Sequence, residues 1–227
     1  MTPVTESDRF DVSGKVVIIT GATKGLGRAF AFGLAQAGAK VAVSSRKADL
    51  CAATAAEISD KTGAETLGLA CHVGQWDAIP QFVDAVQERF GRIDGLINNA
   101  GISPAFVDLV DMTSEYWDKV FSTNLKGPLR LAALVAPVMR DGGGGSIVNI
   151  SSVGGYRGAP RNSHYSASKA ARRQAELSAT PPVLSKAAPC LGEDSRRVLA
   201  DLLGLGPAEI DELISLGVVE EFEPEQP

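Results

Sequence analysis

Short apolar runs alternate with longer amphipathic stretches along the first 150 residues of the chain. β-Branched apolar runs bounded by turn residues predict buried parallel strands, and the stretches between them have the spacing of helices. We expect five strands, at residues 15–20, 40–45, 66–71, 93–97 and 146–152. The intervening helices are expected at residues 28–37, 48–61, 76–90 and from Thr113 onward. Strands that alternate with helices in this way predict an α/β fold built on a doubly wound parallel sheet.

The regular alternation ends soon after the fifth expected strand. A helix begins near Ser163, and Thr180-Pro181-Pro182 ends it, because proline cannot continue a helix. Apolar residues at helical spacing then predict short helices, one of them at residues 207–215. We therefore expect a sheet domain over residues 1–178, truncated after its fifth strand and the following helix. The remainder is expected to be a linker at 179–191, a small helical appendage at 192–219 and a disordered acidic tail at 220–227.

The composition is that of a globular protein, with 44% hydrophobic and 22% charged residues. The sequence has no run of 18 apolar residues, and residues 1–10 lack the apolar core of a secretory signal. No membrane partner is therefore expected. The net charge of −5 argues against a general nucleic-acid surface. Residues 1–191 have a net charge of +3, and residues 192–227 have a net charge of −8. This shift in net charge supports a boundary between the two segments.

The three cysteines are Cys51, Cys71 and Cys190. Scattered cysteines in odd number are typical of reduced thiols in a cytoplasmic protein. The only histidines are His72 and His164, and no Cys/His spacing suits zinc. We expect no metal site.

A glycine-rich turn follows the first expected strand and leads into a helix. It comprises Gly21, Ala22, Thr23, Lys24, Gly25, Leu26 and Gly27. Glycines between a strand and a helix let the backbone approach a pyrophosphate, which the N–H groups and partial positive charge of the helix N-terminus bind. The simpler interpretation is a tight turn without a ligand, but the position between strand and helix favours a dinucleotide cofactor.

The end of the second expected strand indicates which dinucleotide binds. This strand ends beside the adenosine ribose, where an acid binds the 2′-hydroxyl of NAD and a base accommodates the 2′-phosphate of NADP. Here Ser45 precedes Arg46 and Lys47, with no acid until Asp49, and Lys24 adds a cation nearby. The pattern favours NADP (NADPH) over NAD. Arg46 and Lys47 are also compatible with solvated charges at a helix start.

Further polar and small residues follow the other expected strands. His72 and Val73 follow the third strand, near the expected place of the adenine; Asn98-Asn99-Ala100-Gly101 closes the fourth, and Ser152 ends the fifth. Ligands of doubly wound sheets bind outside the carboxyl ends of the strands. These residues, the glycine turn and the helix from Ser163 therefore converge on one edge of the sheet.

A tyrosine and a lysine four residues apart lie on this last helix, in the stretch Tyr165-Ser166-Ala167-Ser168-Lys169. Side chains at this spacing share one helix face. A fixed ammonium stabilises a neighbouring phenolate, so the pair can donate and accept a proton near neutral pH. Tyr-x-x-x-Lys alone matches many chains by chance, and it gains weight here from the motifs that precede it.

Asn124 is expected inside the long helix that Thr113 caps, although asparagine is a poor helix former. Two interpretations have equal weight: a local distortion presents its amide to the site, or Asn124 is a surface residue. His164, beside Tyr165, is interpreted as a helix-start residue rather than a catalyst.

Together and in order, these motifs resemble the classical short-chain dehydrogenase/reductase family over about residues 12–171. The matching motifs are Thr20-Gly21-x-x-x-Gly25-x-Gly27, Asn98-Asn99-Ala100-Gly101, Asn124, Ser152 and Tyr165-x-x-x-Lys169. The runs at residues 43–47 and 71–74 are similar to the NADP-dependent carbonyl reductases of that family. The resemblance implies a Rossmann-like fold and an oxidoreductase that interconverts a carbonyl and a secondary alcohol.

The resemblance also implies a role for each matching residue. Tyr165 is the general acid of reduction, and Lys169 holds the nicotinamide ribose and stabilises the phenolate. Ser152 binds the substrate carbonyl, and Asn124 holds a water that links Lys169 to solvent. Where the family usually has an aspartate that contacts adenine, this chain has His72. The expected cofactor-binding residues are Gly21, Thr23, Lys24, Gly25, Leu26, Gly27, Ser45, Arg46, His72, Val73, Asn98, Ala100, Gly101, Tyr165 and Lys169.

A second resemblance concerns residues 177–219, which are similar to the carboxyl end of the class III CoA-transferases. On this interpretation the chain is a hybrid, and its sheet lacks the sixth and seventh strands of the reductase family. A homo-oligomer is possible, but this truncation compromises its interface. Two functions follow. One is an NADP-dependent oxidoreductase acting on a small-molecule carbonyl or alcohol, and the other is a non-catalytic nucleotide-binding remnant.

Overall fold

The computed structural model describes residues 11–103, 107–173, 196, 199–200, 205–216 and 219. The chain divides into two units, residues 1–175 and residues 176–227. Within the described residues, no helix is both long and apolar enough to cross a membrane.

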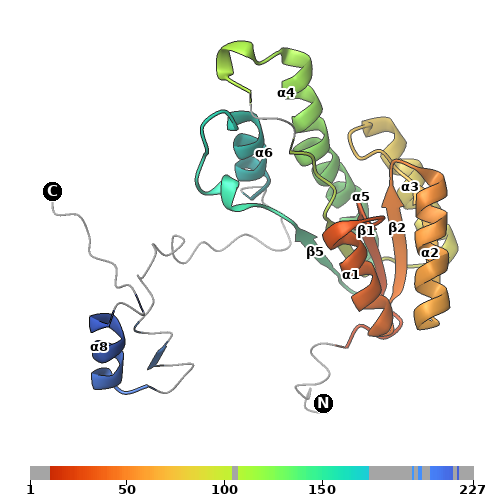
Figure 1. The fold of residues 1–227 in the computed structure, drawn as a ribbon. Helices are drawn as coiled ribbons and strands as arrows, with labels where there is room; N and C mark the ends of the chain where they lie inside the picture. Colours follow the sequence, from red (N-terminus) through yellow and green to blue (C-terminus); the bar gives the residue numbers. More distant parts are fainter. Residues whose placement is uncertain are drawn as a thin grey trace. The chain divides into compact units, whose positions relative to one another are not determined.

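A five-stranded parallel sheet organises the first unit (Figure 1). Its strands are β1 (Val16–Thr20), β2 (Lys40–Ser45), β3 (Thr66–Ala70), β4 (Gly95–Asn98) and β5 (Ser146–Asn149). They lie in the order β3-β2-β1-β4-β5, which confirms the predicted doubly wound parallel sheet. The chain runs outward from β1 to β3 and then returns to β4, so the switch point lies between β1 and β4. Sheets of this kind bind ligands in the crevice at that point.

Helices cover both faces of the sheet, because alternate residues of each buried strand point to opposite faces. On one face, α1 (Gly25–Gln36) and α2 (Ala48–Thr62) pack against the strands. The core on that face contains Val17, Ile19, Val41, Val43, Ala31, Ala35, Ala55 and Ile58. On the other face lie α3 (Ile79–Phe90), which follows the short helix η2 (Trp76–Ala78), and α5 (Gly127–Asp141). The core there contains Val16, Ile18, Leu96, Phe82, Val83, Val86, Leu131 and Val135.

The predicted long helix after Thr113 consists of three continuous segments. They are α4 (Ser114–Phe121), the π-helical turn η4 (Ser122–Lys126) and α5. Thr113 caps α4 as predicted, since its Oγ1 accepts a hydrogen bond from Tyr116 N at 3.2 Å. In η4, Gly127 N donates to Ser122 O, five residues back. Such single-turn π-bulges are frequent at functional sites.

The remaining described elements of the first unit are η3 (Leu109–Asp111), η5 (Val153–Gly155) and α6 (Ser163–Arg173). Helices α4 and α6 lie side by side (Figure 1), and α6 also contacts η4 and η5. β5 is the edge strand of the described sheet, and its Val148 is 45% exposed.

Two predicted boundaries near the site are wrong by a few residues. α1 begins at Gly25 rather than at residue 28, because the end of the glycine turn itself forms the first helical turn. β5 ends at Asn149 rather than at Ser152. Beyond Asn149, the carbonyl of Ile150 accepts a hydrogen bond from Lys169 Nζ instead of from a strand.

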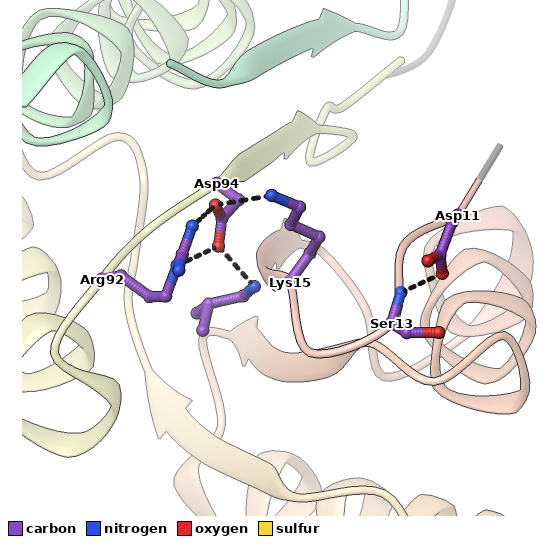
Figure 2. Close-up of polar contacts among 6 residues, drawn as sticks. Asp11, Ser13, Lys15, Arg92 and Asp94 are labelled. Carbon is purple, nitrogen blue, oxygen red and sulfur yellow. Dashed lines mark hydrogen bonds and ion pairs between the residues drawn. The ribbon is translucent and has the colours of Figure 1, made fainter. Parts of the chain in front are cut away.

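An ion cluster ties together the amino ends of three strands (Figure 2). The Asp94 carboxylate accepts hydrogen bonds from Arg92 and from the backbone N of Val16, at 2.9 Å, and it lies 3.7 Å from Lys15 Nζ. The backbone of Asp94 also bonds to Val16 O and Ser146 N. The cluster therefore connects β1, β4 and β5 at the edge of the sheet opposite the site.

In the second unit, α8 (Pro207–Ser215) has the predicted bounds. Glu209 caps it by accepting a hydrogen bond from Gly206 N at 2.8 Å, and Ile210 is buried. The predicted linker at 179–191, the start of the helical segment at 192–195 and the tail at 220–227 lie outside the described residues.

Candidate active site

The glycine turn after β1 is packed so closely against the end of β4 that side chains are excluded. Gly21 has a φ of +65°, in the left-handed region that favours glycine. A Cβ on Gly27 would overlap both Asn99 Nδ2 and the carbonyl oxygen of Gly21. Asn99 Nδ2 donates to Thr20 O at 2.8 Å, and Thr20 Oγ1 accepts from Asn99 N and Ala100 N. These bonds lock the ends of β1 and β4 together at the switch point.

A cleft of about 730 Å³ opens at this edge of the sheet. Most of the predicted cofactor residues line it: Gly21, Thr23, Lys24, Gly25, Leu26, Gly27, Ser45, Arg46, His72, Val73, Ala100 and Gly101. Its charged side chains are all cations, namely Lys24, Arg46, Lys47 and Lys119, and no carboxylate of the described chain lines it. The cleft is therefore built to hold an anion.

The end of β2 is held by a buried cysteine. Ser45 N donates to Cys51 Sγ at 3.1 Å, and the Ser45 hydroxyl lies 3.2 Å from the same sulfur. Cys71, at the end of β3, donates its backbone N–H to Ser45 O. Burial, followed by the proximity of Cys51, raises the pKa of the Cys71 thiol to about 11. The Cys71 thiol is therefore protonated at neutral pH and behaves as a small apolar group.

Asn98 is not among the residues that line the cleft, and its role in cofactor binding stays a prediction. Its side chain is buried and donates to Pro128 O at 3.2 Å and to Asn149 Oδ1 at 3.1 Å. Because successive strand residues point to opposite faces, Asn98 faces α5 and ties β4 to β5, and Asn99 takes the position at the cleft. Asn99 belongs to the predicted motif Asn98-Asn99-Ala100-Gly101, but it is not among the expected cofactor-binding residues.

Tyr165 and Lys169 share one face of α6, as their spacing predicts. Lys169 is only 4% exposed, and its Nζ donates to Ile150 O at 2.9 Å. The same Nζ lies 5.7 Å from the centre of the Tyr165 ring. Neither residue is among those that line the cleft. The carbonyl of Ile150 therefore fixes the ammonium beside the tyrosine.

Ser152 and Tyr165 flank Gly154. Gly154 N donates to Ser152 Oγ at 3.1 Å, which begins η5. A Cβ on Gly154 would stand 3.5 Å from Ser152 Oγ and 3.5 Å from Tyr165 Cε1. The serine hydroxyl and the tyrosine ring therefore both lie against the position of Gly154.

Asn124 lies within η4 and is fully buried, so the surface interpretation is wrong and the distorted-helix interpretation is confirmed. Its Oδ1 accepts from Ile102 N at 2.8 Å, and its Nδ2 donates to Ile102 O at 2.9 Å and to Ser168 Oγ at 3.1 Å. Ser168 Oγ in turn donates to Tyr165 O at 2.7 Å. Asn124 therefore braces the segment after β4 against the helix that carries Tyr165.

Gly101 joins the cofactor cleft to this second group of residues. It lines the cleft, and a Cβ on it would stand 3.4 Å from both Asn124 Oδ1 and Lys169 Nζ. The glycine turn and the Tyr165–Lys169 pair therefore converge on the carboxyl end of β4, although they are more than 130 residues apart in the sequence.

His164 is the second residue of α6, in agreement with its interpretation as a helix-start residue. It is fully buried, and its ring packs edge-on against Tyr116, with 5.4 Å between ring centres. Burial lowers the pKa of His164. His164 lies between α4 and α6 and is not among the residues that line the cleft, which favours a role in packing.

Sequence reasoning missed three residues that shape the site. Asn99 was detectable as the neighbour of Asn98 in the quoted motif. Ser168 was detectable as a small polar residue on the face of the helix next to Tyr165. Lys119 lines the cleft from α4, and only the packed fold brings it there.

Comparison with known proteins agrees with this geometry. A family model described as short chain dehydrogenase matches residues 15–179. Dehydrogenase/reductase SDR family member 4 of Sus scrofa is 37% identical over 163 residues, which are 72% of this chain and 58% of that protein. The chain thus spans less than two thirds of the length of this curated relative.

Two similar solved structures carry different dinucleotides. A metagenomic short-chain oxidoreductase in complex with NADP is 36% identical and has a TM-score of 0.68, over 71% of this chain and 73% of that one. An NAD⁺-bound xylitol dehydrogenase is 33% identical with a TM-score of 0.68, over 71% of this chain and 62% of that one.

Proposed function

Because this chain belongs to the short-chain dehydrogenase family, we propose that it is an NADP-dependent oxidoreductase that interconverts a carbonyl and a secondary alcohol. The observation that carries the proposal is the convergence at Gly101, which lines the cleft and lies beside both Lys169 and Asn124. The substrate is a small carbonyl compound or the corresponding alcohol.

The glycine turn fits the pyrophosphate of a dinucleotide. Gly21 and Gly27 keep side chains out of the turn, so a phosphate can approach the backbone. The N-terminus of α1 has no side-chain cap and no acidic residue in its first turn. Its N–H groups and partial positive charge therefore remain available for an anion.

The charges of the cleft favour the 2′-phosphate of NADP. Arg46 and Lys47 follow β2, Lys24 lies in the glycine turn, and no carboxylate of the described chain lines the cleft. A carboxylate at the end of β2 would instead suit the 2′-hydroxyl of NAD. Since similar structures hold either NADP or NAD⁺, the preference rests on the charges of this chain.

Ser152 and Tyr165 bind the carbonyl oxygen of the substrate together. Gly154 N occupies one lone pair of Ser152 Oγ, so the serine hydroxyl can donate its hydrogen to that oxygen. Tyr165 donates a second hydrogen bond and passes its proton to the oxygen as the alcohol forms. Lys169, held by Ile150 O, stabilises the phenolate that remains. A bound nicotinamide supplies the hydride, and oxidation of an alcohol uses the same residues in reverse.

Turnover by the purified chain tests this proposal. With NADPH and a panel of small ketones and aldehydes, we expect substrate-dependent loss of NADPH absorbance. Tyr165→Phe removes the proton donor but keeps the ring, so we expect the rate to fall by about 100-fold or more. Calorimetry should show that the variant still binds NADPH.

Tyr116→Phe is the matched control, because it makes the same change in a tyrosine of α4 whose ring packs against His164, and it should keep the rate. NADPH binding without any turnover would favour the alternative, a non-catalytic nucleotide-binding chain. Absence of NADPH binding would contradict both functions.

The cysteines bear on where the protein works. Cys51 and Cys71 are both free thiols, and buried free thiols are typical of reducing compartments. We therefore propose a cytoplasmic location.

A further inference from the structure

The order of the strands indicates where the base of a bound dinucleotide lies. The carboxyl ends of β1, β2 and β3 follow one another along one side of the sheet. The glycine turn after β1 fits the pyrophosphate, and Ser45 and Arg46 after β2 fit the adenosine ribose. His72 and Val73 come next, after β3, and both line the same cleft. The base therefore lies against His72 and Val73.

The ring of His72 is held in one orientation by the backbone. Gly74 N donates a hydrogen bond to His72 Nδ1 at 3.0 Å. A Cβ on Gly74 would stand 3.0 Å from His72 Cε1 and 3.2 Å from Nδ1, so this edge of the ring rests against the glycine. An imidazole nitrogen that accepts a hydrogen bond carries no proton, and the ring hydrogen is then on the other nitrogen. Nε2 of His72 is therefore a donor.

This donor is available to a ligand. Nε2 has no hydrogen-bond partner within the described part of the chain, and it is not among the buried polar atoms without a partner. Lys119 and Thr123 line the same cleft as His72. No carboxylate of the described chain is present in the cleft to accept a hydrogen bond from an amino group.

We infer that His72 recognises the purine of the cofactor as a hydrogen-bond donor, through Nε2–H, and so reads an acceptor on the base rather than its exocyclic amine. The inference rests on the proposed binding of NADP(H). Adenine presents the acceptor N1 beside its 6-amino group, and unsubstituted purine keeps N1 as an acceptor but has no amino group beside it. An aspartate at this position would do the opposite, because an ionised carboxylate only accepts hydrogen bonds.

Calorimetric titration of the full chain with two dinucleotides tests the inference. One is NADPH, and the other is its 6-deamino analogue, in which unsubstituted purine replaces adenine and a hydrogen stands in place of the amine. We expect the dissociation constant of the analogue to be within about twofold of that of NADPH, since Nε2–H can donate to N1 of either base. In His72→Asp, we expect the ratio of the two constants to rise by about tenfold in favour of NADPH, the size of one hydrogen bond.

Lys47→Asp is the matched control for charge. It also adds a carboxylate at the cleft, but after β2 rather than β3, so it should weaken both dinucleotides and leave their ratio unchanged. A wild-type chain that binds NADPH at least about tenfold more tightly than the analogue overturns the inference. An unchanged ratio in His72→Asp overturns it too. If neither dinucleotide binds, the proposed cofactor itself is wrong, and the inference falls with it.

Discussion

At the scale of single residues, Gly101 and Gly154 decide which groups can meet. A Cβ on Gly101 would contact Asn124 and Lys169. A Cβ on Gly154 would contact Ser152 and Tyr165. Neither glycine has a positive φ, so backbone strain does not select glycine there. A Cβ would stand 3.4–3.5 Å from these side chains, at ordinary contact distance, and we infer that side chains larger than that of alanine at either position would separate the groups that the proposed reaction brings together.

The preference for NADP is a prediction at the residue scale. Arg46 is exposed at the end of β2 and lines the cleft. We expect Arg46→Asp to weaken NADPH binding by about tenfold, because it removes a charge-assisted contact to the 2′-phosphate. NADH has no such phosphate and should bind at least as well as before. Calorimetry with both dinucleotides measures the change.

Arg140→Asp is the matched control, since it makes the same change of charge on an exposed part of α5 outside the cleft. Equal losses of NADPH affinity in Arg46→Asp and Arg140→Asp would mean that Arg46 acts only through the net charge of the protein.

At the scale of elements, the π-helical turn η4 is predicted to stabilise α6. Asn124 satisfies both backbone groups of Ile102 and also holds Ser168. Asn124→Leu leaves these buried partners without a hydrogen bond, so we expect a loss of about 3 kcal/mol in the free energy of unfolding. Urea denaturation measures the loss, and turnover should fall with it.

Asn124→Asp separates the hydrogen bond that Asn124 accepts from the hydrogen bonds that it donates. It keeps the oxygen that accepts from Ile102 N but removes the donors to Ile102 O and Ser168. A change below about 0.5 kcal/mol in either variant, as for ordinary surface positions, would show that η4 does not brace α6.

The ion cluster at the amino end of the sheet gives a pH prediction at the same scale. Burial raises the pKa of Asp94, but hydrogen bonds from Arg92 and Val16 N outweigh it and hold the pKa below its ordinary value. A carboxyl with a depressed folded-state pKa contributes stability above its unfolded pKa and loses it as the pH falls. We therefore expect this contribution to disappear below about pH 4.

Asp94→Asn should lower the free energy of unfolding by about 2 kcal/mol near neutral pH and make the acid loss shallower, as followed by urea denaturation across pH. Asp141→Asn is the control, because Asp141 is 72% exposed and pairs only with its exposed neighbour Arg140 in the described chain. Identical pH profiles for wild type and Asp94→Asn would rule out this role for the cluster.

At the scale of the whole molecule, the sequence predicted the sheet and most of the cleft lining. Buried β-branched runs and glycine turns are local signals, and so is the four-residue spacing of Tyr165 and Lys169. The family resemblance over residues 12–171 is confirmed by the match to residues 15–179. The resemblance of residues 177–219 to CoA-transferases stays a prediction.

The contacts that complete the site were not predictable in the same way. The orientation of Asn98 toward α5 depends on which face of β4 each asparagine occupies, and that is fixed by the register with β5. The contacts of Lys169 with Ile150 and of Asn124 with Ser168 join segments that are distant in sequence. Only the packed fold determines such pairs.

Transfer of labelled hydrogen from the cofactor to the substrate is the sharpest test of catalysis by this chain. The purified chain is incubated with a small ketone and NADPH that carries deuterium at the reactive carbon of the nicotinamide, and the alcohol product is examined by mass spectrometry. Our account predicts deuterium on the carbinol carbon, and loss of that product in Tyr165→Phe. NADPH that binds without ever yielding a deuterated alcohol from any ketone tested would contradict the account.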